Sequence, residues 1–209
     1  MHQRGLLKQP SILFPVIWLG TISMLTQAHS LENADYLSPL EKKIVQEMNL
    51  ARSNPGAYAS FLNELKQHYD GKLLKKPGKI PLVTQEGVSA VDEALGFLRS
   101  SDQLPPLSPS RGMSMGARDH VEDQGPKGLI GHQGSDGSDA GDRVNRYGAW
   151  EKQVGENISY GGDDARQIVM GFIIDPNYHV VGVACGPHAV YHTMCVITFA
   201  GGYTEQRKD

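Results

Sequence analysis

The sequence predicts an α+β or layered α-β-α domain, and two observations predict it. Apolar residues recur at helical spacing in several segments between residues 38 and 124. Two strand-like apolar runs, residues 180–185 and 194–200, then lie close together near the C-terminus. Helices that precede a late antiparallel pair of strands are typical of a domain built in layers around one core.

The first two helices are expected to meet at a single break in the pattern. Ser38 and Glu41 form a capping-box pattern with Pro39 at the first helical position, so a helix begins here. Apolar residues then fall at helical spacing until Asn54-Pro55 ends this helix and starts a second one. The apolar face of the second helix comprises Tyr58, Phe61, Leu62 and Leu65.

A loop and three further helices are expected after the second helix. The loop is residues 70–81, which are rich in lysine, glycine and proline. Periodic apolar residues then predict helices over residues 86–100 and from about residue 110 to residue 123. A last helix is expected to run from residue 163 or 164, both aspartates that can cap it, to residue 174.

The C-terminal runs favour a hairpin that carries a disulfide. Cys185 and Cys195 are the chain's two cysteines, and an isolated pair in an oxidising compartment is more typical of a disulfide than of a metal or redox site. If the two runs pair as antiparallel strands, the cysteines can face each other, with residues 186–192 connecting or extending the strands. The bond would close a short loop and stabilise the fold by about 2–3 kcal/mol.

The N-terminal residues contain, in this order, the positive region, the apolar run and the small residues that are typical of a secretion signal. Arg4 and Lys8 make a small positive region, and an almost wholly apolar run, Ile12–Leu25, follows. Ala28-His29-Ser30 supplies the small residues of a cleavage site. The apolar run is shorter than the roughly 20 residues of a membrane-spanning helix.

We therefore expect a signal peptide over residues 1–30, a single domain over residues 31–209 and a secreted location, extracellular or periplasmic. An uncleaved N-terminal anchor is the alternative. The chain has a net charge of −3, and because the signal holds two positive charges and no negative one, the rest carries −5. This charge gives no reason to propose nucleic acid or an anionic membrane as a partner.

A polar loop and a glutamate are the candidates for chemistry. Residues 125–142 are rich in glycine and aspartate, and they bring His132, Ser135 and Asp136 close together in sequence. Asp136, Ser138 and Asp139 can equally cap the helix that follows. Glu156 enters a short strand, where a carboxylate needs a partner. His132 and Glu156 can form an acid/base couple, half of a metal site, or a purely structural hydrogen bond.

The remaining candidates have structural interpretations. His188 and His192 are four residues apart, but in a hairpin this spacing places them only on one face, and we interpret both as surface or hairpin residues. His120 is interpreted as a packed, hydrogen-bonded histidine of a helix. Trp150 is interpreted as a core residue.

Several short motifs occur in a fixed order: Ala51-Arg52-x-Asn54-Pro55, Ala117-Arg118-x-His120, His132-x-Gly134-Ser135-Asp136-Gly137-Ser138, Arg143-Val144-x-Arg146-Tyr147-Gly148 and Gly155-Glu156-Asn157-Ile158. In this order they resemble the CAP superfamily of cysteine-rich secretory, antigen 5 and pathogenesis-related 1 proteins, in its bacterial SCP-domain branch. The resemblance covers about residues 40–203. It implies a secreted three-layer α-β-α sandwich with a short central antiparallel sheet. It also implies a cleft of two histidines and one or two carboxylates, which in some members binds zinc or another divalent ion, with His132 and Glu156 at matching positions.

The sequence departs from that pattern after the last predicted helix. The branch carries its second histidine in a loop of the type Ser-x-Gly-His-Arg-x-Asn, and no Gly-His-Arg occurs in this chain. Residues 173–179 run directly into the strand, so the loop is missing as a block. His179 is the nearest substitute ligand, and a catalytic zinc site needs three protein ligands.

Three functions follow from these features. The first is an extracellular binding module without turnover, for a sterol, lipid, glycan or protein. The second is a metal-dependent hydrolase or peptidase, with His132 and His179 as ligands and Glu156 as the base that activates water. The chain has no HExxH motif, and no oxyanion-hole signature accompanies Ser135 near His132. The third is a folded but inactive, internally shortened copy.

Overall fold

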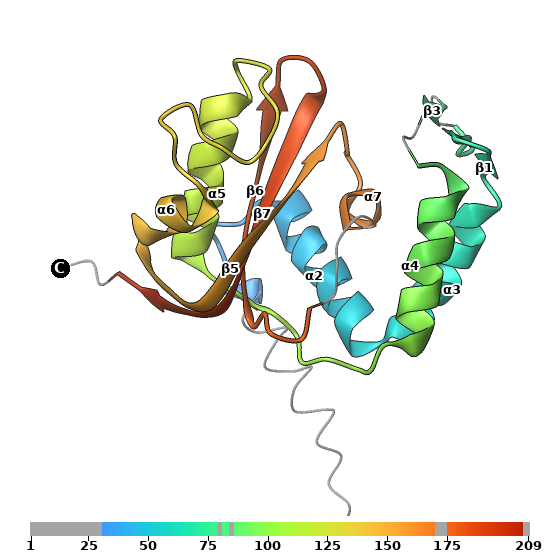
Figure 1. Ribbon diagram of the computed structural model, residues 1–209, viewed down its shortest axis with the longest axis horizontal. Coiled ribbons are helices and arrows are strands. Elements are labelled where there is room, and N and C mark those ends of the chain that lie inside the picture. The colour runs from blue at the N-terminus through green and yellow to red at the C-terminus, as the bar shows by residue number, and fades with distance from the viewer. Residues whose placement is uncertain (1–30, 79–80, 84–85, 170–174, 207–209) are drawn as a thin grey trace, which may run out of the picture.

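The computed structural model describes residues 31–78, 81–83, 86–169 and 175–206 (Figure 1). The predicted signal peptide lies outside the described residues, and so do residues 170–174, where the last helix is expected to end and the shortened connection to begin. The helices are α2 (Pro39–Ser53), α3 (Pro55–Lys66), α4 (Val88–Ser100), α5 (Arg111–Gln124), α6 (Ala140–Asn145) and α7 (Ala165–Val169). In this part of the chain no helix combines the length and the apolar character required to cross a bilayer.

The main sheet has the strand order β4-β6-β7-β5. Its strands are β4 (Ser108–Pro109), β5 (Gly148–Tyr160), β6 (Val180–His188) and β7 (His192–Glu205). β5, β7 and β6 pair antiparallel, as predicted, whereas the short β4 runs parallel to β6 and makes the sheet mixed. Both hairpin strands are longer than the two apolar runs. Residues 186–188 and 192–193 extend them at the turn, and residues 201–205 extend β7 at its other end.

A second, smaller sheet corrects the prediction of a loop over residues 70–81. β1 (Tyr69–Asp70), β2 (Leu73–Leu74) and β3 (Leu82–Val83) pair antiparallel in sequence order. Gly71, with a φ of 58°, supplies the left-handed conformation in the turn between the first two. Strands of two residues are too short to show an alternating pattern, so the sequence did not indicate them.

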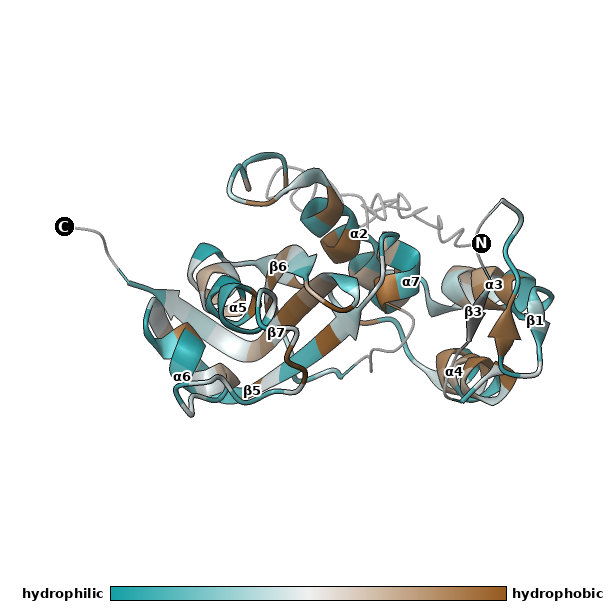
Figure 2. Ribbon diagram, turned by 90° about the horizontal axis from the view of Figure 1, so that it is seen from above, coloured by the Kyte–Doolittle hydropathy of each residue, from teal (hydrophilic) through white to brown (hydrophobic). Residues whose placement is uncertain are grey.

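Helices cover both faces of the main sheet, as expected for an α-β-α sandwich (Figure 1). Alternation along β7 divides its side chains between two cores. Cys195, Ile197 and Phe199 pack into the larger core, which holds buried residues of α2, α3, α4 and α7. Met194, Val196 and Ala200 face α5 and α6. Figure 2 shows the hydrophobic stretches of the central strands between these layers, with α3 and α4 packed together beside them.

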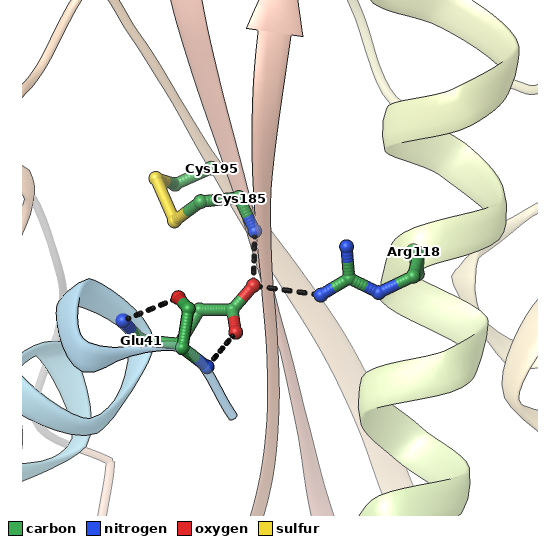
Figure 3. Close-up of a disulfide and its surroundings, with 5 residues drawn as sticks. Glu41, Arg118, Cys185 and Cys195 are labelled. Carbon is green, nitrogen blue, oxygen red and sulfur yellow. Dashed lines mark hydrogen bonds and ion pairs between the residues drawn. A yellow bond between two sulfur atoms is a disulfide. The ribbon is translucent and has the colours of Figure 1, made fainter. Parts of the chain in front are cut away.

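The buried carboxylate of Glu41 joins the two helical layers across the edge of β6. The predicted capping box is present, and Glu41 Oε2 accepts from Ser38 N at 2.6 Å. The other oxygen, Oε1, accepts from Cys185 N of β6 at 2.7 Å and from Arg118 Nη2 of α5 at 2.8 Å (Figure 3). Glu41 is 1% exposed. One side chain therefore satisfies donors from α2, β6 and α5.

The predicted disulfide between Cys185 and Cys195 is confirmed (Figure 3). The two residues are direct cross-strand partners, with Cα atoms 4.1 Å apart. The N–H of Cys185 binds Glu41 at the sheet edge instead of β7, so the pair is of the non-hydrogen-bonded type, in which facing side chains lie closest. The disulfide and Glu41 thus fix the same position of β6 from two sides.

We expect Glu41→Gln to lower the free energy of unfolding by about 1.5–3 kcal/mol. Glutamine preserves the shape, but its amide NH2 would face one of three donors that now bind a carboxylate oxygen. Asp92→Asn is the matched control, because it removes a carboxylate from the exposed ion pair with Lys66 and should cost less than about 1 kcal/mol. Equal losses for the two variants in urea unfolding would contradict this role of Glu41.

Candidate functional site

The structure brings the predicted pair, His132 and Glu156, into contact and adds Arg143 to it. Glu156 lies on β5 opposite Thr198 of β7, and its side chain is 3% exposed. Its Oε1 is 3.0 Å from His132 Nδ1, and its Oε2 accepts from Arg143 Nη2 at 2.6 Å. The Arg143 side chain is 2% exposed, whereas that of His132 is 66% exposed. The result is a buried ion pair with one exposed imidazole attached to it.

The contact with Glu156 determines which ring nitrogen of His132 is left as a hydrogen-bond acceptor. A carboxylate accepts hydrogen bonds, so Nδ1 is the nitrogen that carries the proton in this contact. In the neutral imidazole the acceptor lone pair is then on Nε2. His132 therefore offers an oriented hydrogen-bond acceptor on a ring that is otherwise largely exposed.

Three buried side chains hold three consecutive backbone carbonyls of the loop that carries His132. His120 Nε2 lies 2.9 Å from Gly131 O, and Arg143 Nη2 donates to His132 O at 3.1 Å. Gln124 Nε2 donates to Gln133 O at 2.6 Å. These side chains are at most 3% exposed. The irregular loop therefore has a fixed backbone at His132, which α5 and α6 impose.

Sequence reasoning foresaw only part of this arrangement. The interpretation of His120 as a packed, hydrogen-bonded histidine is confirmed, with an exposed fraction of 0%. The roles of Gln124 and Arg143 were missed. The spacing of His120 and Gln124, four residues apart on α5, places both on one face of the helix and is the signal that could have found Gln124.

Ser135 and Asp136 lie in the same loop as His132, but their hydrogen-bond partners are other residues. Ser135 donates through its backbone N and its hydroxyl to Asp123, and its Oγ accepts from Lys127. The side-chain hydrogen bond from Lys127 contributes most to holding the pKa of Asp123 well below its usual range. No hydrogen bond joins Ser135 to His132 among the described residues. Ser135 thus anchors the loop to the end of α5.

Asp136 stabilises the turn that leads into α6. Its Oδ1 accepts from Ser138 N at 2.9 Å, and its Oδ2 pairs with Arg146 at 2.7 Å. Hydrogen bonds from Ser138, followed by the contact with Arg146, lower the pKa of Asp136 to about 2. The cap itself is Asp139, which forms a capping box with Asp142. Of the three capping candidates, Asp139 is therefore the one that caps α6.

His179 does not join the His132–Glu156 pair. It lies just before β6, and its Nδ1 is 3.0 Å from the carbonyl of Asn177. Glu156 pairs with Thr198, which in turn pairs with Gly182 of β6. His179 is therefore two strand spacings across the sheet, roughly 10 Å, and a further roughly 10 Å along β6 from Glu156. Among the residues that the structure describes, no group of three or more His, Cys, Asp or Glu side chains could hold a metal ion.

The donor set at Glu156 does not fit the zinc site that the resemblance implies. One carboxylate oxygen binds Arg143 and the other binds His132, whose Nδ1 is thereby also engaged. A guanidinium already lies against the carboxylate, where a metal cation would have to approach it. A catalytic zinc ion needs three protein ligands, and His132 Nε2 is the single free nitrogen in this described contact.

Of the two interpretations of His188, surface residue or hairpin residue, the structure supports the second, because His188 ends β6 opposite His192. His188 is 2% exposed, because loop residues 125–131 cover the end of the hairpin where it lies. His192 is exposed, as expected. Trp150 is partly buried and packs against Met113, Val144 and Ala200, which agrees with a core position.

Residues 95–197 match the family model CAP, the cysteine-rich secretory protein family. This part of the chain is a CAP domain. The match runs from α4 into β7 and includes His132, Arg143 and Glu156, so the site lies within the CAP domain. No curated protein and no solved structure matches the chain significantly.

Titration of His120 is expected to make stability fall in mild acid. Burial lowers the pKa of His120, against the hydrogen bond to Gly131 O, so the folded state holds the neutral ring. The unfolded chain takes up this proton near pH 6.5. Below that pH the unfolded state binds more protons, so the stability contributed by the neutral ring is present above about pH 6.5 and is lost as the pH falls toward the folded pKa.

His120→Gln should remove this pH dependence and keep the hydrogen bond to Gly131, because Gln Nε2 can also donate. Urea unfolding at about pH 7 and about pH 5 measures it. We expect the variant to lose less stability than the unsubstituted protein over this interval. The neighbouring charges, Asp123, Arg143 and Glu156, are unchanged in the variant. An identical loss in both proteins would contradict the assignment.

Proposed function

We propose that this protein is a secreted CAP-domain binding module that acts outside the cell without turnover. The CAP match and the Cys185–Cys195 disulfide support an exported protein, since such bonds persist in oxidising compartments. The signal-like residues 1–30 agree with this. Within the family we assign the chain to the bacterial SCP-domain branch, without the loop that carries the second cleft histidine.

The observation that carries the proposal is the geometry of His132. Its ring is exposed, while Glu156 orients it through Nδ1 and is itself locked by Arg143. A fixed acceptor at the surface is suited to bind a hydroxyl or amide group of a sterol, lipid, glycan or protein. Because α5 and α6 hold the surrounding backbone, binding needs little ordering of the loop.

A metal-dependent hydrolase that uses His132 and Glu156 is the second candidate. In that mechanism Glu156 would take a proton from water, and His132 would bind the metal. Each oxygen of Glu156 already accepts a hydrogen bond, from His132 or from Arg143, and the side chain is only 3% exposed, so water has little access to this carboxylate in the arrangement described. The binding module is therefore the better supported function. An inactive, internally shortened copy would share the fold and lack the binding.

The proposal predicts saturable binding that depends on His132. Purified protein would be titrated with cholesterol, phosphatidylcholine and a panel of soluble oligosaccharides. Loss of one hydrogen bond in His132→Ala should weaken the bound probe about threefold to tenfold. His192→Ala, which removes another exposed histidine, should leave the affinity unchanged.

A casein assay with and without zinc distinguishes the two candidates. The binding module predicts no zinc-dependent cleavage. Zinc-dependent cleavage that is lost in Glu156→Gln would establish the hydrolase instead. Absence of both cleavage and binding in folded protein would favour the inactive copy.

A further inference from the structure

Two loop segments far apart in sequence form an exposed apolar surface at one end of the molecule. We call Leu129, Ile130, Val190 and Tyr191 the apolar tip. Their exposed fractions are 44%, 62%, 61% and 44%. They make up four of the seven exposed large hydrophobic residues in the part of the chain that is described. Leu129 and Ile130 lie in the loop that follows α5, and Val190 and Tyr191 lie in the turn between β6 and β7. Figure 1 shows this loop beside this turn.

The buried ring of His188 joins the two halves of the apolar tip. Its Nε2 is 2.9 Å from Leu129 O, and its Nδ1 accepts from Val190 N at 3.2 Å and from Tyr191 N at 3.1 Å. Tyr160 packs against the rings of His188 and Tyr191. The ring thus fixes the backbone of both segments.

Two further hydrogen bonds complete the attachment of the loop to the hairpin and to β5. Ala189 N donates to Gly125 O at 2.9 Å, and Gly131 N donates to Tyr160 Oη at 2.9 Å. The four apolar side chains are therefore held exposed by a fixed backbone instead of lying on two independent loops.

The apolar tip is free of permanent charge. Residues 128–132 and 187–194 contain no Asp, Glu, Lys or Arg, although 21% of the chain is charged. The nearest lysine, Lys127, is paired with Asp123. The titratable residues along these segments are His132, His188, Tyr191 and His192. Burying the apolar tip in an apolar phase would thus desolvate no fixed charge.

We propose that the apolar tip docks on a neutral lipid bilayer, with Ile130 and Val190 entering the boundary between headgroups and acyl chains. Tyrosine is a residue type favoured at that depth, and Tyr191 supplies it. Attachment at this boundary strengthens with the apolar area that is buried there, and Leu129, Ile130 and Val190 contribute to that area. A second copy of the chain is a poorer occupant, because a stable dimer buries about 800 Å² on each partner, which four partly exposed loop side chains do not provide.

This surface is distinct from the acceptor on His132 that the proposed function uses. Only Gly131 separates Ile130 from His132 in the sequence. Insertion of the apolar tip would consequently bring His132 near the lipid–water boundary. Failure of either proposal leaves the other intact, because different substitutions test them.

Cosedimentation with phosphatidylcholine vesicles tests the proposal. The unsubstituted protein should sediment with the vesicles, and Ile130→Ser combined with Val190→Ser should lower the partition coefficient at least about tenfold. Phe97→Ser is the matched control, because Phe97 is 45% exposed on α4, away from the tip, and should have no effect. The N-terminal residues are the same in all proteins, so their contribution cancels.

A fluorescent variant keeps the test valid if the double serine variant does not fold. Ile130→Trp should show a blue-shifted emission when vesicles are added, whereas Phe97→Trp should not. The proposal is overturned if the unsubstituted protein does not bind vesicles, or if Phe97→Ser weakens binding as much as the double variant. It is also overturned if the double variant abolishes a concentration-dependent dimer and leaves vesicle binding unchanged.

Discussion

The buried contact between Arg143 and Glu156 is the interaction on which the site depends. Two charges out of water are stable only when their remaining hydrogen-bonding groups are satisfied. The two terminal nitrogens of Arg143 meet this condition by also donating to the carbonyls of Ser138 and His132, whereas its buried Nε has no partner among the described residues. Glu156 meets it by binding the His132 ring. Removal of one partner from such a pair typically costs about 3–5 kcal/mol. The loop that holds His132 has little regular structure of its own, so its conformation follows from this pair and from the carbonyls that α5 binds.

A second buried carboxylate, Glu41, has a corresponding role in the fold. It binds donors from α2, β6 and α5, and therefore links both helical layers to one edge of the sheet. The disulfide between Cys185 and Cys195 fixes the same point of β6 to β7. The sandwich and the site are thus each organised around one buried carboxylate. Glu41 accepts hydrogen bonds from three segments, and Glu156 binds His132 and Arg143.

The features that were predicted correctly are those that depend on nearby residues. The capping box at Ser38, the break at Asn54 and the facing cysteines all depend on residues close in sequence or in neighbouring strands. Residue types alone left the pairing of His132 with Glu156 as one of several possibilities, and the order of the family motifs supported it. The sequence missed the role of Arg143, because the pattern of a short helix does not show which charged side chain a distant strand will bury. It also did not show that His188 is buried, since alternation along a strand does not reveal that a loop covers it.

The central claim is that Arg143 supplies the positive charge beside Glu156, so that His132 acts as a hydrogen-bonding group and not as a metal ligand. Calorimetric titration of zinc into the purified protein, with His132→Ala as the control, tests this most directly. The account predicts that the heats of the two proteins are the same and show no tight binding. Tight zinc binding that disappears in His132→Ala would contradict it, because further ligands would then have to assemble around an imidazole that the structure assigns to Glu156.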